Sequence, residues 1–372
     1  MANDISLIIL SGGNSTRFGQ NPKKQWINIK DEPLWLFVVN RFKKNYSFDK
    51  IVVVGSKDEL NYMSNFCCDI DMVASGQTRQ KSIQNAITHI STKYVMISDT
   101  ARCCFAKKVV KNLIKNHLKA DCIVPTIDIN DTIVYNYEYI NRDKTKLVQT
   151  PQLSNTALLK KAISSDIDYT DESSAIKAND GKLLYIKGDK KSHKITTKND
   201  IKKIDCLKKP SKKVLVGFGY DIHKFINNKP LYLCGVKIDS QFGLQAHSDG
   251  DVAIHSVIDA IIGAIGAGDI GDFFPDNDNK YKDISSVKLL EYIVLFVSKT
   301  GFEIVNIDMT IVAQIPKISP HKKQLRYSLS KILKIKPNHI NIKATTNEQI
   351  DTIGDSKAMC VYCVANLKYS KV

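Results

Sequence analysis

An Asp-x-His pair and a histidine on a predicted helix have the residue types of a metal site. Asp221 and His223 follow the apolar run 214–218, and residues two apart on a strand point to the same face, so their side chains converge. His255 lies downstream in a largely apolar segment and could face this pair. Two histidines and one carboxylate form a known catalytic zinc set that leaves a fourth position for water or substrate. The spacing makes these three residues candidate zinc ligands.

The helix that carries His255 offers two more carboxylates. Asp251, His255 and Asp259 are spaced four residues apart, so they stack on one stripe of the helix. Spacing alone does not rank them as ligands. Each motif also occurs without a metal, since Asp-x-His is common in surface turns and a helical histidine is often a core residue.

Phosphate binding is indicated near the N-terminus. The apolar run 5–10 leads into the glycine-rich stretch 11–19, whose small residues let backbone amides approach phosphate oxygens, and Arg17 adds a cation. The stretch is neither a P-loop nor a complete dinucleotide-binding motif. Asp99 closes another apolar run, where it is placed to hold Mg²⁺ or to cap a helix.

Strands and amphipathic helices alternate through the first 210 residues. Apolar runs predict strands at 5–10, 51–54, 72–74, 94–97 and 122–124, and helical patterns span 78–89 and 106–118. This alternation is typical of a doubly wound α/β domain, in which ligands bind outside the carboxyl ends of the strands. Polar clusters follow three of the strands, at 11–19, 76–82 and 98–102, so we expect them to form one site.

The composition changes in a lysine-rich stretch, 187–213, that contains Pro210. We predict a first domain at 1–209, a short linker at 210–213 and a second domain at 214–372. The second domain has predicted strands at 214–218, 305–312, 340–344 and 358–365, with helices at 252–262, at 284–299 and ending near 333. This pattern predicts an α+β domain.

Hydrophobic residues at 43% and charged residues at 25% describe an ordinary globular protein. We expect a cytoplasmic protein, because neither a signal peptide nor a membrane span is evident. Nine scattered cysteines suit a reducing compartment, and Cys360 and Cys363 should be buried thiols on opposite faces of a strand. Much of the net charge of +16 comes from lysines between 187 and 213 without interleaved aromatic residues, which favours solvated lysine-rich surfaces over nucleic-acid binding. A basic field would also suit small phosphorylated substrates.

Eight motifs of the first domain resemble, in order and spacing, those of 2-C-methyl-D-erythritol 4-phosphate cytidylyltransferase. They are Leu10-Ser11-Gly12-Gly13 through Phe18, Pro22-Lys23-Lys24-Gln25, Gly76 through Ser82, Asp99 through Arg102, Asp131-Thr132, Thr150-Pro151-Gln152, Thr170-Asp171-Glu172 and Lys194-Ile195-Thr196. The resemblance covers nearly the whole domain. It implies transfer of CMP from CTP to the substrate's phosphate, with release of pyrophosphate.

The same resemblance implies roles for individual residues. Arg17 and Lys24 would bind the CTP phosphates and offset the charge that builds at the α-phosphorus. Asp99 would bind Mg²⁺ or Mn²⁺. The implied substrate contacts are Gly76 and Ser82 for the nucleotide and Arg142 and Lys194 for the methylerythritol phosphate, with Arg102, Thr132 and Thr150 as further substrate contacts. Three departures from the family pattern, at Ser11-Gly12, Gln77 and Thr100, fall where backbone contacts do the binding.

The second domain resembles 2-C-methyl-D-erythritol 2,4-cyclodiphosphate synthase. The matching motifs are Tyr220 through His223, Ala246 through Asp251, His255, Gly268 through Gly271, Phe274-Pro275-Asp276, Ala313-Gln314, Pro316-Lys317 and Lys343 through Thr346 with Glu348. The implied reaction is a cyclisation in which the 2-phosphate attacks the β-phosphorus of the cytidine diphosphate arm and expels CMP. Together the two resemblances imply a fusion of two non-consecutive enzymes of the methylerythritol phosphate route to isoprenoids.

This second resemblance assigns Asp221, His223 and His255 jointly to Zn²⁺ and gives Asp251 and Asp259 orienting or structural roles. Glu348 would hold a second divalent ion, Mg²⁺ or Mn²⁺, and His247 and Thr346 would stabilise the transition state. The implied substrate contacts are Ser248, Asp269, Gly271, Asp276, Ala313, Lys317, Thr345 and Glu348. Family members are trimers with sites between subunits, so we expect at least a trimer through this domain, with a hexamer as the alternative. The chain departs from the family pattern at 350–356.

Two other functions fit parts of the sequence. A zinc hydrolase joined to a sugar-nucleotide transferase would turn over a phosphate ester without a cyclic product. A basic RNA-binding protein would bind RNA tightly and with a steep salt dependence.

Overall fold

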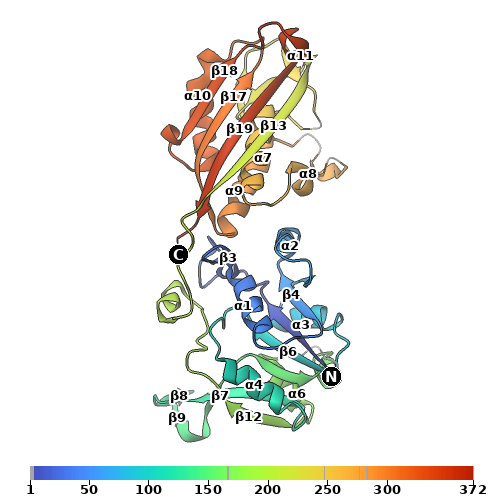
Figure 1. Cartoon of the computed structure of the whole chain (residues 1–372), viewed down its shortest axis with the longest axis vertical. Helices are drawn as coiled ribbons and strands as arrows, with labels where there is room; N and C mark the ends of the chain where they lie inside the picture. The colour runs from blue at the N-terminus through green and yellow to red at the C-terminus, as the bar shows by residue number, and fades with distance from the viewer. Residues whose placement is uncertain (1–3, 166, 247, 276, 282–283, 372) are drawn as a thin grey trace. The chain divides into compact units, whose positions relative to one another are not determined.

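The protein is described from a computed structural model (Figure 1). The structure describes residues 4–165, 167–246, 248–275, 277–281 and 284–371. The chain divides into two compact units, the first ending at Lys209 and the second running from Pro210 to Lys371. Within the described residues, every helix is too short or too polar to cross a membrane.

The first unit is built on an eight-stranded mixed sheet. Its centre is a parallel set in the order β6 (Tyr94–Asp99), β1 (Ile5–Leu10), β4 (Ile51–Gly55) and β5 (Asp71–Ala74). In parallel strands the carboxyl ends lie at one edge, so the loops after β1, β5 and β6 meet there. The predicted doubly wound α/β domain is confirmed.

Beyond β6 the sheet changes direction. An antiparallel strand, β11 (Gln152–Asn155), lies between β6 and β7 (Cys122–Asp128), and β7 also pairs with β10 (Lys146–Val148) and β12 (Leu183–Lys187). The apolar runs did not predict β11, because its sequence is Gln-Leu-Ser-Asn. Tertiary pairing stabilises this polar segment as a buried strand.

One face of this sheet is covered by α3 (Arg79–Ile87), α5 (Thr156–Ala162) and α6 (Glu172–Ala178), which share one buried apolar cluster with the strands. The side chain of Thr78 caps α3 by accepting from the amide of Lys81 at 3.2 Å. The remaining elements of this unit are α1 (Leu34–Lys43), α2 (Leu60–Ser64), α4 (Lys107–Lys115) and the short pair β2 (Asn28–Ile29) and β3 (Glu32–Pro33).

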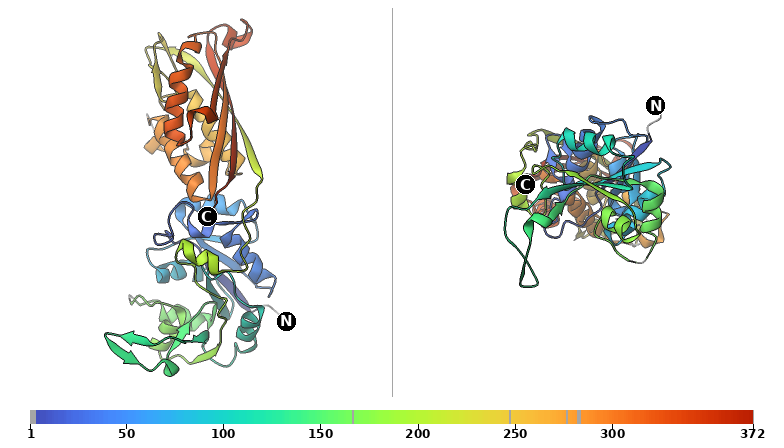
Figure 2. Two further views of the ribbon diagram at one scale, coloured as in Figure 1. Left: turned by 90° about the vertical axis from the view of Figure 1, so that its left-hand side faces the viewer. Right: turned by 90° about the horizontal axis from the view of Figure 1, so that it is seen from below.

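A two-stranded arm projects from the first unit (Figure 2). It consists of β8 (Ile133–Tyr135) and β9 (Glu138–Ile140), which form a separate two-stranded sheet. Its apolar side chains are largely exposed, with Tyr137 at 98% and Tyr139 at 80%.

The second unit has a five-stranded sheet of long strands. The order is β16 (Phe242–Leu244), β13 (Val214–Asn227), β19 (Ala358–Tyr369), β17 (Phe302–Val312) and β18 (Ile340–Thr345). The other elements are β14 (Leu231–Leu233), β15 (Val236–Ile238), α7 (Val252–Ala264), α8 (Ile270–Phe273), α9 (Ser286–Lys299), α10 (Lys322–Leu333) and α11 (Asp351–Gly354). The predicted α+β domain is confirmed.

Two glycines let α7 lie directly on β13. A Cβ on Gly217 would come within 2.0 Å of the Ala260 carbonyl oxygen, and one on Gly219 within 2.0 Å of the Ser256 oxygen. The α7 helix carries His255, and β13 carries Asp221 and His223, so this close packing brings the predicted ligands together.

The long helices cover one face of the second sheet and leave most of the other bare (Figure 2). Side chains that alternate along β13 point to the bare face, with Val216 63%, Phe218 62% and Tyr220 43% exposed. We refer to Val214, Val216, Phe218, Tyr220, Ile222 and Tyr362 as the bare apolar strip.

The cysteines differ in part from the prediction. Cys360 and Cys363 are buried in β19, as expected for structural thiols. Cys104 and Cys206, by contrast, form a disulfide across 102 residues. Scattered sequence positions do not show that a loop and a chain segment meet in the fold, which is why this pair was not expected.

Candidate functional site

The first unit has a cavity of about 580 Å³ at the carboxyl ends of β1, β5 and β6. The three predicted polar clusters all contribute to it. Six of the predicted site residues line it: Arg17, Lys24, Gly76, Ser82, Asp99 and Lys194. The Ser82 hydroxyl accepts from the Gly76 amide at 3.0 Å, which closes the loop before α3.

Asp99 is the electrostatic centre of this cavity. Its Oδ2 accepts from Lys194 Nζ at 2.8 Å, and its Oδ1 lies 3.3 Å from Arg79 Nε. Burial alone would raise the pKa of Asp99, but the charges and hydrogen bonds of Arg79 and Lys194 lower it to about 2. The carboxylate is therefore ionised at neutral pH.

Arg79 is a cavity residue that the sequence interpretation did not single out. Its Nη1 lies 2.8 Å from Oε1 of Glu172, a side chain with no exposed surface. Arg79 therefore connects a buried carboxylate to the cavity carboxylate Asp99. The sequence feature that could have identified Arg79 as a cavity residue is its place in the first turn of the helix that follows the 76–78 loop.

Two adjacent lysines have different environments. Lys23 Nζ pairs with Glu59, whose Oε2 also accepts from Trp26 Nε1 at 2.7 Å, and both charged side chains are buried. Lys24 faces the cavity, where its Nζ donates to the Ile195 carbonyl at 3.1 Å. Burial and the neighbouring charge of Lys194 lower the pKa of Lys24.

Four predicted residues lie outside this cavity. Thr150 is next to it, since its hydroxyl accepts from the Asp99 amide at 3.4 Å, and Arg102 donates to the Ser192 carbonyl at 2.7 Å. Thr132 is exposed beside the arm, and Arg142 lines a separate hollow with Asp128 and Lys146. Within one chain the structure does not bring Thr132 and Arg142 to the other predicted residues.

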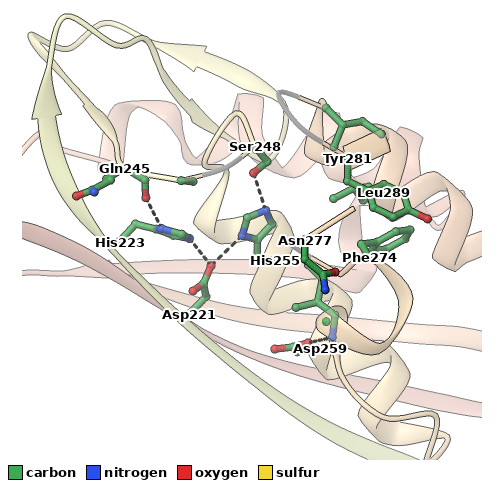
Figure 3. A pocket seen from close by; sticks show the side chains of 14 residues that line it. Asp221, His223, Gln245, Ser248, His255, Asp259, Phe274, Asn277, Tyr281 and Leu289 are labelled. Carbon is green, nitrogen blue, oxygen red and sulfur yellow. Dashed lines mark hydrogen bonds and ion pairs between the residues drawn. The ribbon is translucent and has the colours of Figure 1, made fainter. Parts of the chain in front are cut away.

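The second unit has a cavity of about 830 Å³ (Figure 3). Among its lining residues are Asp221 and His223 of β13, His255 of α7, and Ser248 and Gly271. His223 Nε2 lies 2.9 Å and His255 Nδ1 lies 3.0 Å from the same oxygen, Asp221 Oδ2. The three potential ligand atoms all lie within 4.8 Å of one another.

Hydrogen bonds on the far side of each ring fix which nitrogen carries the proton. His223 Nδ1 lies 2.7 Å from the Gln245 carbonyl oxygen, an acceptor, so this nitrogen must donate. His255 Nε2 lies 3.0 Å from Ser286 Oγ, and that hydroxyl uses its own proton on Asp249 Oδ1 at 2.5 Å. His255 Nε2 therefore donates as well. In their neutral forms both imidazoles direct lone pairs at Asp221 Oδ2.

This arrangement concentrates negative charge density. Burial would raise the pKa of Asp221, but hydrogen bonds to the two histidines hold it well below its usual range. Burial would lower the pKa of His223, but its hydrogen bond and charge interaction with Asp221 raise it. A proton or a metal cation between the rings and the carboxylate is needed to offset the repulsion between the imidazole lone pairs and the carboxylate oxygen.

The other two carboxylates of the His255 stripe have structural roles. Asp251 is fully buried and caps α7, with its oxygens accepting from the amides of Ile254, Cys234 and Gly235. Asp259 accepts from the Ile270 amide at 2.9 Å and so fixes the start of α8. The residues that orient His255 are instead Ser248, drawn in Figure 3, and Ser286. Ser286 and Gln245 were not predicted.

The remaining predicted residues of this unit fall into three groups. His247 and Asp276 lie outside the described residues. Asp269 caps α8, next to the cavity. A second cluster lies at the carboxyl ends of β17 and β18: Ala313, Lys317, Thr345, Thr346 and Glu348, with Thr346 Oγ1 donating to Glu348 Oε1 at 2.8 Å.

Strand register separates this second cluster from the zinc candidates. Ile222, between Asp221 and His223, shares one row of the sheet with Cys360, Val312 and Thr345. Three strand spacings therefore lie between Ile222 and Thr345, or about 14 Å at the usual interstrand distance. The loop 350–356, which departs from the family pattern, contains α11, and its Ile353 packs on Val312, Ala358 and Cys360.

Comparison with known proteins assigns each of the two units to a family. Residues 5–207 match the family described as 2-C-methyl-D-erythritol 4-phosphate cytidylyltransferase, and residues 214–368 match the YgbB family. A protein from Aliarcobacter butzleri named "Bifunctional enzyme IspD/IspF" is 51% identical over 366 residues, with 98% of each chain covered. The chain belongs to the bifunctional IspD/IspF family.

Two further relatives agree with this membership. A Sulfurimonas denitrificans protein of the same name is 47% identical, with 98% of this chain and 94% of that protein covered. The solved "Structure of the Bifunctional IspDF from Campylobacter jejuni" matches with a TM-score of 0.86 at 42% identity, covering 99% of each chain. The chain therefore combines a cytidylyltransferase domain and a cyclodiphosphate synthase domain of the methylerythritol phosphate pathway.

Proposed function

We propose that the synthase domain binds one Zn²⁺ through Asp221 Oδ2, His223 Nε2 and His255 Nδ1. The supporting observation is that outer hydrogen bonds point both imidazole lone pairs at one carboxylate oxygen, at 2.9 and 3.0 Å. This donor set suits zinc, which binds imidazole and carboxylate and leaves a further position open in catalytic sites. When bound, Zn²⁺ supplies Lewis acidity and a template for phosphate oxygens.

The chain's own residues have separate tasks in the cyclisation. Gln245, Ser248 and Ser286 hold the two rings in position. His247 and Thr346 stabilise the transition state, and Glu348 holds a second divalent ion, Mg²⁺ or Mn²⁺. Substrate contacts come from Ser248, Asp269, Gly271, Asp276, Ala313, Lys317 and Thr345.

In the cytidylyltransferase domain, Arg17 and Lys24 bind the CTP phosphates and stabilise charge at the α-phosphorus. Their place in the cavity beside the 76–82 loop supports this assignment, with Gly76 and Ser82 on the nucleotide. Lys194, Arg102 and Thr150 bind the methylerythritol phosphate, as do Thr132 and Arg142.

Asp99 is the candidate ligand for Mg²⁺ in this domain, since a carboxylate together with phosphate oxygens suits that ion. Its Oδ2 already accepts from Lys194. Lys194 and a magnesium ion would compete for this oxygen, so the ammonium group becomes available to a substrate phosphate when the ion is present.

The assembly is at least a trimer through the synthase domain. Two features support it: the bare apolar strip on β13, and the separation of Glu348 and Thr346 from the zinc ligands within one subunit. A neighbouring copy would join the two clusters. The exposed arm of the first unit supplies a second apolar contact, which supports a hexamer and would bring Arg142 and Thr132 to another subunit's cavity.

The domains are 1–209 and 214–372, joined by the linker 210–213, and the protein is cytoplasmic. The boundary of the compact units at Lys209 and Pro210 supports the first assignment. The seven free cysteines among the described residues support the second.

Metal analysis tests the zinc proposal. Purified full-length protein should contain about one zinc per chain, as a single three-ligand site requires. His255→Ala should lose the zinc and the synthase activity while keeping cytidylyltransferase activity. Absence of zinc from active enzyme would refute the assignment.

A further inference from the structure

Three cysteine sulfurs lie together in the first unit, away from the residues that line its main cavity. Cys104 and Cys206 form a disulfide with a Cα–Cα distance of 6.0 Å, and the Cys103 sulfur lies within 4.8 Å of both. Burial raises the pKa of the Cys103 thiol to about 12, so it remains protonated beside the linked pair. No step of the two reactions uses these residues.

The disulfide closes a series of contacts that leads to the catalytic cavity. On one side is the loop after β6, running from Asp99 to Cys104, and on the other is the segment 192–206. Arg102 Nη1 donates to the Ser192 carbonyl at 2.7 Å, and the Ile195 amide donates to the Ala101 carbonyl at 2.9 Å. Lys194 then reaches Asp99 at 2.8 Å.

Both proposed phosphate-binding lysines depend on this segment. Lys24 Nζ donates to the Ile195 carbonyl, and Lys194 is the adjacent residue. Apart from the Lys194–Asp99 ion pair, the other contacts between loop and segment are hydrogen bonds, whose net stabilisation is small because water competes for the same groups. The disulfide is the covalent restraint among them, so its presence controls how firmly Lys194 and the Ile195 carbonyl are held.

Small reagents can reach the sulfur pair. Cys104 and Cys206 line a hollow of about 250 Å³ together with Arg41, Lys191 and Lys203. Asp189 and Asp205 are also in its wall, so the charged side chains there are three cations and two carboxylates. The cationic excess of this hollow favours an anionic thiol or disulfide of low molecular weight, such as glutathione.

We propose that Cys104 and Cys206 are a redox-modification site whose disulfide locks segment 192–206 and thereby sets the affinity of the cytidylyltransferase for methylerythritol phosphate. The proposal rests on the proposed role of Lys194. It also agrees with a reducing compartment, where the few disulfides of proteins are commonly transient or redox-sensing.

The exchange is balanced with glutathione disulfide as oxidant. The Cys206 thiolate, the more exposed of the pair, attacks one sulfur of glutathione disulfide and expels one glutathione thiolate. The Cys104 thiolate then attacks the Cys206 sulfur and expels the second glutathione. Two protein thiols lose two electrons and two protons, and one glutathione disulfide becomes two glutathione molecules. Reduction by a dithiol reverses both steps.

The test uses the full-length enzyme, reduced with a phosphine and then equilibrated with glutathione at defined ratios. Differential alkylation with mass spectrometry measures the Cys104–Cys206 link, and the two activities are assayed on the same samples. Reduction should raise the KM for methylerythritol phosphate about tenfold, since loss of positioning commonly costs that much or more. The synthase activity of the same chain should not change, and this is the internal control.

Variants make the comparison specific. Cys206→Ser should have the KM of the reduced enzyme at every glutathione ratio, whereas Cys68→Ser, at an exposed cysteine, should respond like the wild type. Cys103→Ala should also keep the response, because this residue is not part of the link.

Three results would overturn the proposal: a pair that stays reduced at all ratios, a link that forms without any change in KM, or a fall in bound zinc caused by Cys206→Ser, which would make the thiols a metal site. Lys194→Ala in the oxidised enzyme tests separately the assumption that Lys194 binds methylerythritol phosphate. If that substitution leaves KM unchanged, the role of Lys194 is wrong, whereas the thiol mapping is judged independently.

Discussion

Lys194 Nζ lies 2.8 Å from Asp99 Oδ2, although 95 residues separate the two along the chain. Arg79 occupies the other side of the same carboxylate, and Glu172 lies behind Arg79. A row of alternating charges therefore runs from the buried interior of the first unit to its cavity. Lys194 lies at the cavity end of this row.

Replacing Lys194 should impair the first reaction selectively. Lys194→Ala is expected to lower kcat/KM for methylerythritol phosphate by about a hundredfold, the usual effect of removing one charged donor from a phosphoryl-type transition state. Steady-state kinetics on both activities would measure this. The matched control is Lys190→Ala at an exposed lysine four residues earlier. Equal losses in the two variants would contradict the assignment.

Lys24 should produce an alkaline limit on CTP use. Burial and the charge of Lys194 lower its pKa below the ordinary value of 10.5, so the cation is present at neutral pH and is lost as pH rises through the lowered pKa. We expect kcat/KM for CTP to fall at a pH below 10.5. In Lys24→Arg, whose guanidinium stays charged, this limb should move to higher pH. An unchanged profile would show that another group sets the limit.

Arg79 should be important for the stability of the first unit. Arg79→Met leaves Glu172 as an uncompensated buried charge, which costs about 3 to 5 kcal/mol in free energy of unfolding. Urea denaturation followed by tryptophan fluorescence reports this unit alone, because both tryptophans of the chain, Trp26 and Trp35, are buried in it. The double change Arg79→Met with Glu172→Leu should recover most of the loss. If Arg79→Met is as stable as the wild type, the Arg79–Glu172 ion pair contributes little to the free energy of unfolding.

Ser286 should tune zinc affinity without contacting the ion. It accepts from His255 Nε2 and donates to Asp249, so Ser286→Ala frees the ring to rotate. We expect zinc affinity to fall by about 10 to 100-fold, as for other outer partners of metal-bound histidines. Competition with a fluorescent chelator measures the dissociation constant. The control is Ser285→Ala, since that side chain makes no capping hydrogen bond at the start of α9.

The bare apolar strip should hold the synthase subunits together. Phe218→Lys places a charge on a side chain that is 62% exposed in the single chain and would be desolvated in a trimer. We expect smaller assemblies by native mass spectrometry and loss of the synthase activity, with cytidylyltransferase activity retained. Tyr327→Lys, at a comparably exposed aromatic residue on α10, should leave the assembly intact. An unchanged assembly for Phe218→Lys would exclude this surface as the contact.

Local patterns predicted the elements that carry both sites. The apolar runs of β1, β4, β5 and β6 and the helical pattern of α3 correctly placed the three polar clusters at one edge of a sheet. The sequence did not predict β11, because its residues are polar and its strand conformation depends on pairing with β6 and β7. Nor did spacing predict the Cys104–Cys206 link, which joins segments 102 residues apart.

The sequence by itself determined that Asp221 and His223 share a face, because side chains alternate along any strand, and that Asp251, His255 and Asp259 share a helix stripe. Only the tertiary structure decided which of those three meets Asp221. Helical spacing does not fix the rotation of a helix against a sheet, and here Gly217 and Gly219 seat α7 so that His255 faces β13. Asp251 instead caps the start of α7 itself, and Asp259 accepts from the first amide of α8, because free backbone amides at helix starts need acceptors.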